Sequence, residues 1–145
     1  WDAAKLTEWV LDREQWVIWD PAGIDTPHRN LLALATIFGG LDIEAYPQLL
    51  EQQSEIAADL PAPDQINFDH YDLMVQRRIT QTLLPLEPDI LGECYVLNHL
   101  QPPDRGFEPR AKLQRFVEAA LDTDAMAAIT FWLRAAKDHP AHPAL

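Results

Sequence analysis

The stretch DTPHRNLLALATIFGG, residues 25–40, decides the fold of this chain. Asp25 has a side-chain oxygen that can cap a helix N-terminus, Pro27 fits the first turn, and Gly39-Gly40 is typical of a helix end. Between these signals, apolar residues cover nearly the whole circumference of a helix, which only a helix surrounded by protein tolerates. They are Leu31, Leu32, Ala33, Leu34, Ala35, Ile37 and Phe38. The stretch therefore predicts a buried central helix over residues 27–38.

On both sides of this helix, proline and glycine residues divide the chain into short segments in which apolar residues recur at helical spacing. We expect further helices over approximately residues 2–15, 47–59, 68–84, 88–101, 109–121 and 125–138. The stretch WVIW at residues 16–19 fits either the end of the first helix or a short β-like extension. The sequence thus predicts an all-α fold: a single compact domain over residues 1–145, with about six or seven helices around the central one. A short, proline-punctuated tail follows from about residue 139.

Helical spacing also predicts which side chains face the core. The expected inward line of the first helix consists of Ala3, Leu6, Val10 and Val17. That of the segment 68–84 consists of Phe68, Tyr71, Val75, Ile79 and Leu83. In the last helix it consists of Ala125, Ile129, Trp132 and Ala136, whereas Phe131 falls on a different face.

The composition limits the class of protein. Of 145 residues, 48% are hydrophobic and 23% are charged, which is typical of a globular chain and not of a disordered one. No apolar run approaches the roughly 18 residues of a membrane span, so we expect no membrane partner. Cys94 is the only cysteine, which excludes an internal disulfide and favours a reducing compartment, so we expect a cytoplasmic location. The first residue, Trp1, leaves open whether a targeting segment precedes it.

Charge is distributed unevenly along the chain. The formal net charge is −12, and residues 1–76 contain 14 acids against 3 bases. The segment between Arg29 and Arg77 has no basic residue, and its acids are Asp42, Glu44, Glu51, Glu55, Asp59, Asp64, Asp69 and Asp72. Such a surface repels a phosphate backbone. We therefore expect a basic protein partner and no direct nucleic-acid binding.

A row of carboxylates is the sharpest feature of this acidic half. In the expected helix 47–59, Glu51, Glu55 and Asp59 follow one another at i, i+4 and i+8, on the side opposite the apolar residues. Like charges at this spacing destabilise a helix by about a few tenths of a kcal/mol per pair, and this helix has no lysine to offset the repulsion. We predict a partner-binding surface of Glu51, Glu55, Asp59, Asp42 and Glu44. The alternative is that the excess acid serves only solubility.

The motifs of common enzymes and metalloproteins are missing from the sequence. There is no Glu-x-x-His pair, no His-Glu-x-x-His motif and no glycine-rich phosphate loop, so we expect neither a metal nor a cofactor. Cys94 lies on an apolar helix face, where a thiol is normally inert, and His99 lies about 140° around the same helix. These two residues cannot form a catalytic dyad within that helix, and we predict no catalytic residue.

These observations predict a non-enzymatic, acidic helical protein-binding module of the adaptor, chaperone or inhibitor type. A tryptophan left at the surface would be a natural anchor for the partner. Two alternatives remain open. An acidic DNA mimic would need rows of carboxylates near phosphate spacing. A small hydrolase would need two acids that converge in an apolar cleft, one of them with a raised pKa. The sequence does not determine the oligomeric state.

Overall fold

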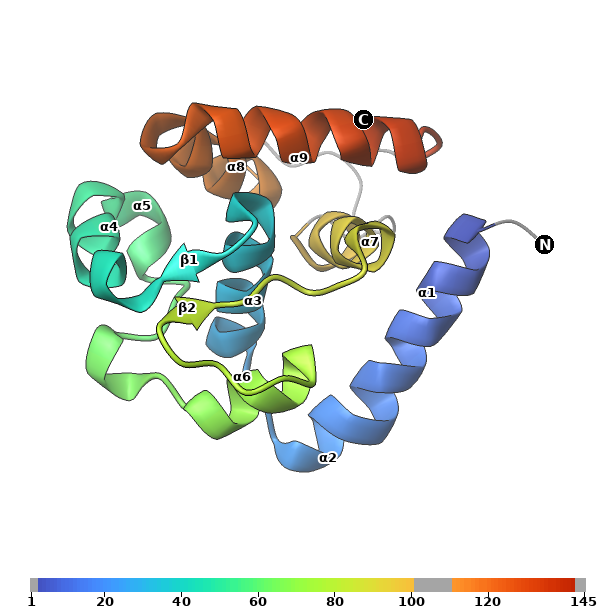
Figure 1. Cartoon of the computed structure of the whole chain (residues 1–145), viewed down its shortest axis with the longest axis horizontal. Helices are drawn as coiled ribbons and strands as arrows, with labels where there is room; N and C mark the ends of the chain where they lie inside the picture. The colour runs from blue at the N-terminus through green and yellow to red at the C-terminus, as the bar shows by residue number, and fades with distance from the viewer. Residues whose placement is uncertain (1–2, 101–110, 143–145) are drawn as a thin grey trace.

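The computed structural model describes residues 3–100 and 111–142. Helix α3 (Thr26–Phe38) runs through the middle of the molecule (Figure 1). Its N-terminus is capped by Asp25, whose carboxylate accepts a hydrogen bond from the backbone N–H of His28 at 2.9 Å. It ends at Gly39, whose φ of 72° lies in the left-handed region that glycine adopts without strain. Residues 31–35 are 0% exposed, so the predicted central helix is confirmed.

The longer helices pack around α3. Helix α7 (Asp89–Leu100) lies between α3 and α1 (Ala3–Glu14). Helices α8 (Lys112–Thr123) and α9 (Ala125–Asp138) form a pair that crosses one end of α3, and α6 (Phe68–Val75) lies near the other end (Figure 1). The predicted all-α fold is therefore confirmed. The predicted helix start at Pro109 lies outside the described residues.

Shorter elements connect these helices. Helix α1 continues into the π-helix η1 (Gln15–Trp19) and then α2 (Asp20–Ala22), so residues 16–19 are helical and not β-like. After α3 come β1 (Leu41–Asp42), the 3-10 turn η2 (Ile43–Ala45), α4 (Tyr46–Gln52), α5 (Ser54–Ala57) and the 3-10 turn η3 (Pro63–Gln65). Strand β2 (Thr82–Leu83) pairs antiparallel with β1. This pairing holds the segment that follows α6 against the segment that follows α3.

The prediction of one helix over residues 47–59 is wrong. The chain leaves helical geometry at Gln53, with φ −116° and ψ 60°, and this break separates α4 from α5. Gln53 donates a hydrogen bond to Asp122 at the end of α8 at 2.6 Å. Leu49 of α4 and Ile56 of α5 are both buried, so both short helices still contribute to the core. Because the contact that favours the break is with α8, nothing within the segment itself reveals it.

The prediction of one helix over residues 68–84 is also wrong. Helix α6 ends after two turns because Gln76 adopts a left-handed conformation, with φ 56°. The chain then reverses and enters β2. The Tyr71 hydroxyl donates to the Leu84 carbonyl at 2.6 Å, which holds the returning chain against α6. Phe68, which was expected in the core, is 41% exposed.

Two helices turn a different face to the core than their hydropathy suggests. In α9 the buried residues are Ala128, Phe131 and Ala135, whereas Ile129 is 46% exposed. In α1 they are Thr7 and Leu11, and the expected Leu6 and Val17 are about half exposed. Both helices are apolar on more than one side, so packing against α3 and α7 selects the buried face. The wider turn of η1 places Trp19 against Tyr95, with ring centroids 5.3 Å apart.

Candidate protein-binding surface

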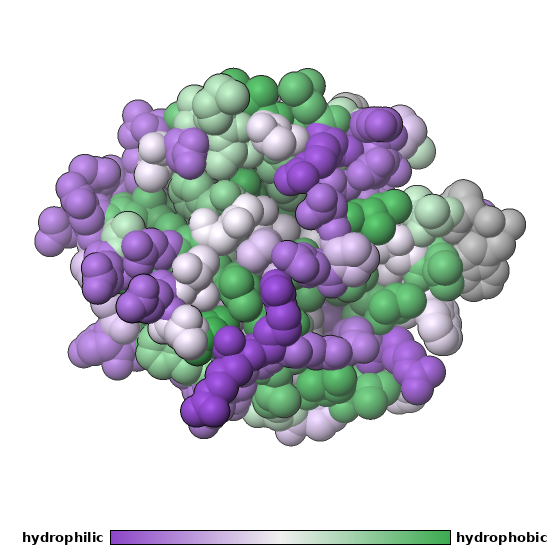
Figure 2. Space-filling view, in the orientation of Figure 1, coloured by the Kyte–Doolittle hydropathy of each residue, from purple (hydrophilic) through white to green (hydrophobic). Residues whose placement is uncertain are grey.

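Four of the five residues assigned to partner binding carry exposed carboxylates. Asp42 ends β1, Glu44 lies in η2, Glu51 in α4 and Glu55 in α5. These elements lie together at one side of the molecule (Figure 1), where hydrophilic side chains gather in the space-filling view (Figure 2). We call Asp42, Glu44, Glu51 and Glu55 the acidic patch. Its first two members are fixed relative to each other, because the Asp42 carboxylate accepts the backbone N–H of Glu44 at 2.9 Å.

The fifth residue, Asp59, lies in a different environment. It follows α5, outside any helix, and its side chain is 30% exposed. Its Oδ2 is 3.0 Å from the guanidinium of Arg115 on α8, and the same guanidinium donates to the Glu55 carbonyl at 3.3 Å. The expected single row of Glu51, Glu55 and Asp59 is therefore interrupted by the break at Gln53. Asp59 fastens the turn after α5 to α8.

In a continuous helix, neutralising Asp59 would remove a like-charge repulsion and slightly stabilise the protein. The ion pair with Arg115 predicts the opposite effect. We expect Asp59→Asn to lower the free energy of unfolding by about 0.5–1 kcal/mol, because it removes a partly exposed ion pair between two elements. Urea denaturation at low salt measures this loss. Glu51→Gln, which removes an exposed carboxylate of the acidic patch, is the matched control and should change stability by less than about 0.5 kcal/mol. Equal stability of Asp59→Asn and the wild type would contradict the structural role of Asp59.

An exposed apolar stripe runs along α1 and η1. Trp9 is 52% exposed and Trp16 is 77% exposed, and Leu6 and Val17 beside them are half exposed. The guanidinium of Arg13 lies 5.8 Å from the ring centroid of Trp9. The stripe faces away from the buried Thr7 and Leu11. A second exposed apolar group, on α8 and α9, consists of Leu121, Met126, Ile129 and Leu133. Contiguous exposed apolar groups on a folded domain are typical of surfaces that contact other proteins.

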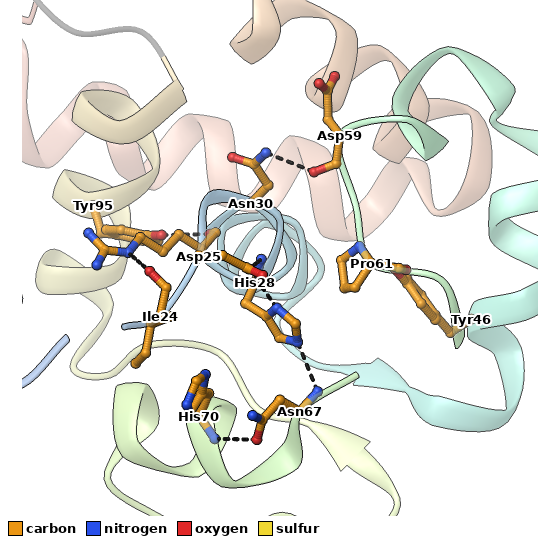
Figure 3. Close-up of polar contacts among 11 residues, drawn as sticks. Ile24, Asp25, His28, Asn30, Tyr46, Asp59, Pro61, Asn67, His70 and Tyr95 are labelled. Carbon is orange, nitrogen blue, oxygen red and sulfur yellow. Dashed lines mark hydrogen bonds and ion pairs between the residues drawn. The ribbon is translucent and has the colours of Figure 1, made fainter. Parts of the chain in front are cut away.

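The polar side chains at the N-terminal half of α3 have partners within the fold (Figure 3). Asn30 donates through Nδ2 to the Asp59 carbonyl at 2.8 Å. The Nε2 of His28 accepts the backbone N–H of Asn67 at 2.8 Å, so its ring proton is on Nδ1, which faces Asp25 at 2.7 Å. These contacts join α3 to the segments before α6. Asp25 and His28, the acid and imidazole that lie 2.7 Å apart, are therefore both engaged in structural hydrogen bonds.

Cys94 and His99 are both tied into the core. Cys94 is 3% exposed, and burial followed by the charges of Glu8 and Asp12 raises the pKa of its thiol to about 12. A thiol with so high a pKa is protonated at neutral pH and reacts slowly. Burial, and then Lys112 and Arg29, lower the pKa of His99 to about 4. The Nε2 of His99 donates to Asn30 at 2.7 Å.

The structure also reveals a carboxyl that the sequence analysis did not single out. Glu93 lies on α7 and is 1% exposed, and its two oxygens have no hydrogen-bond partner among the described residues. Burial, followed by the neighbouring Asp138 carboxyl, raises the pKa of Glu93 from 4.5 to about 8. One feature of the sequence could have indicated this burial. Glu93 is the only charged residue in the segment 90–97, which is otherwise mostly apolar.

Glu93 and Asp138 meet one requirement of a carboxylate hydrolase, a pair of neighbouring acids, but not the other, an accessible cleft. Two acids converge, and one of them has a raised pKa. The Glu93 oxygens, however, are fully buried, so a substrate would not reach them in this conformation. The described residues contain no group of three metal-ligating side chains. Within the same residues, no helix is both long and apolar enough to cross a membrane.

Comparisons with known proteins add no family to these observations. The chain matches no protein-family model, no curated protein and no solved structure. Its function must therefore be inferred from its own surfaces and buried groups.

Proposed function

We propose that this protein is a non-enzymatic protein-binding module of the adaptor, chaperone or inhibitor type, which docks a basic surface of a cytoplasmic partner through its acidic patch. The observation that carries this proposal is the exposure of Asp42, Glu44, Glu51 and Glu55 on neighbouring elements of a segment without any Lys or Arg. Arg115 on α8 pairs with Asp59, which is not a member of the patch. The patch is therefore a region of negative potential that a basic partner would complement.

The exposed apolar stripe on α1 and η1 favours a protein as the partner over a small cation. Trp9 and Trp16 offer large, rigid side chains of the kind that supply most of the energy at protein interfaces. Rim carboxylates, in contrast, act mainly on the rate of association. Because α1 lies on the opposite side of the molecule from α4 and α5 (Figure 1), the proposed division is that the acidic patch orients and docks the basic partner, and that the stripe is a second, separate contact surface.

The direct test compares two double variants of equal charge. Glu51→Gln/Glu55→Gln neutralises two carboxylates of the acidic patch. Glu8→Gln/Asp12→Asn neutralises two exposed carboxylates with the same i, i+4 spacing on α1, on the opposite side of the molecule (Figure 1). The partner is first recovered by cross-linking in the source cell and then purified, and association rates are measured over a range of salt concentrations.

We expect the patch variant to associate about 3- to 10-fold more slowly at low salt, with a weaker salt dependence, because electrostatic steering is reduced. The α1 variant should retain more of the wild-type rate. Identical rates and salt slopes for the patch variant and the wild type would refute docking through the patch and leave these carboxylates as solvated surface. Loss of the partner's nucleic-acid binding in the complex would favour the DNA mimic instead.

A further inference from the structure

Glu93 lies where the end of α9 packs against α7. Its Oε1 is 3.9 Å from Nε of Arg134, and its Oε2 is 3.8 Å from Nε2 of His139. Both distances exceed that of a hydrogen bond, so neither group directly satisfies the carboxyl. The His139 ring, 7% exposed, donates instead to the Ile90 carbonyl at 3.2 Å. A nearly buried carboxyl without a direct partner tolerates a proton far better than a charge.

The charged groups around Glu93 come from several elements. On its own helix lies Asp89, which is 3.0 Å from Arg134. The loop before α7 contributes Glu87, which lines a cavity of about 200 Å³ together with Asp89, Glu93 and Arg134. Helix α9 contributes Arg134 and Asp138, and His139 follows it. Arg134 is thus shared between Asp89 and Glu93, while the charges of Asp138 and Asp89 oppose ionisation of Glu93.

The segment that lies over Glu93 also forms one wall of a larger pocket, which is partly open to solvent. A space of about 620 Å³ lies between α1, α7 and residues 138–142, and Cys94 and Leu97 form part of its wall. Contacts that hold the segment on α7 include His139 with the Ile90 carbonyl, and His142, whose Nε2 is 2.9 Å from Oδ1 of Asn98. Movement of residues 138–142 away from α7 would therefore uncover Glu93 and Cys94 together.

We propose that the proton on Glu93 holds residues 138–142 against α7, and that loss of this proton releases the segment and opens the cavity beside Cys94. In the closed arrangement an ionised Glu93 would be shielded from bulk water beside Asp138, and the guanidinium of Arg134 is shared with Asp89. In the open arrangement it would be hydrated. Deprotonation therefore favours the open form, and the segment is a pH-dependent cover for Cys94.

The sign of the pH dependence follows from the raised pKa. The closed form binds the Glu93 proton more tightly than the open form, so closure is fully favoured below the ordinary glutamate pKa of 4.5 and is lost as the pH rises towards about 8. Release of one proton on opening makes the opening constant rise by about tenfold per pH unit within this window. Above it the constant levels off.

Cys94 is a native reporter of this opening, because it is the only cysteine, is 3% exposed and lines this pocket. The rate of its modification by a small thiol reagent is measured at several pH values. Division by the rate for the urea-unfolded chain at the same pH removes the intrinsic titration of the thiol and gives the opening constant. We expect this constant to rise about tenfold per pH unit between roughly pH 6 and 8 in the wild type.

Glu93→Gln keeps the shape of the side chain and cannot ionise, so its opening constant should not depend on pH. Glu93→Met serves the same purpose if the amide is poorly tolerated. Glu118→Gln, at an exposed glutamate on α8, is the control and should behave as the wild type. Amide exchange of α3 separates local opening from global unfolding and should stay slow while Cys94 becomes reactive.

Three results would overturn the proposal. They are an opening constant of the wild type that does not change with pH, a pH dependence that persists in both Glu93 variants, and exchange of the α3 amides that rises in step with Cys94 reactivity. The last result would mean that Glu93 governs the whole fold and not this segment.

Discussion

Replacement of Phe131 with alanine is expected to lower the free energy of unfolding by about 3–5 kcal/mol, the usual cost of truncating a buried aromatic ring. Phe131 is 2% exposed and belongs to the inward line of α9 with Ala128 and Ala135. Its removal would leave a cavity between α9 and the core. Urea denaturation, monitored by far-UV circular dichroism, measures the loss.

Ile129→Ala is the matched control on the same helix. Hydropathy places Ile129 in the core, but the structure leaves it 46% exposed, so its truncation should cost less than about 1 kcal/mol. The difference between the two variants reports which face of α9 is buried. A larger loss for Ile129→Ala than for Phe131→Ala would show that the helix is rotated relative to this structure.

Gly92→Ala is expected to destabilise the protein by about 1–3 kcal/mol, although the same change in a helix normally stabilises by up to about 1 kcal/mol. A Cβ at Gly92 would lie 2.5 Å from the Leu86 carbonyl oxygen and 2.8 Å from the Thr36 methyl group. Helix α7 could accommodate it only by moving away from α3 and from the backbone before α7. The sign of the change in stability therefore tests how closely these elements approach.

Combining Gly92→Ala with Thr36→Ser separates the two contacts. Serine keeps the hydroxyl, which accepts the backbone N–H of Leu86 at 3.1 Å, but lacks the methyl group. Because the contact with the Leu86 backbone remains, the double variant should recover only a small part of the lost stability. Full recovery would show that the methyl group alone limits the approach, and a stabilising Gly92→Ala would contradict the packing of α7.

The acidic patch was identified from charge distribution, and its members differ in how far the sequence could specify them. Exposure of Asp42, Glu44, Glu51 and Glu55 is the usual outcome for acids, because burying a charge is costly, although Glu93 shows that an acid can be buried. The engagement of Asp59 depends on Arg115, which is 56 residues further along the chain. Local sequence patterns do not predict a contact between residues so far apart in the chain. Glu93 was missed for the same reason, because its neighbours Arg134, Asp138 and His139 come from the far end of the chain.

The sequence alone determined those features whose physical cause is local. The Asp25 cap, the Gly39 stop and the apolar circumference between them specify α3 without reference to any other element, and helical spacing specifies the all-α class. The tertiary structure alone decided three others: the break at Gln53, the early end of α6 at Gln76, and the buried faces of α1 and α9. In each of them two local conformations or two apolar faces are close in free energy. Contacts between segments distant in sequence, such as Gln53 with Asp122 and Tyr71 with Leu84, then select one of the two.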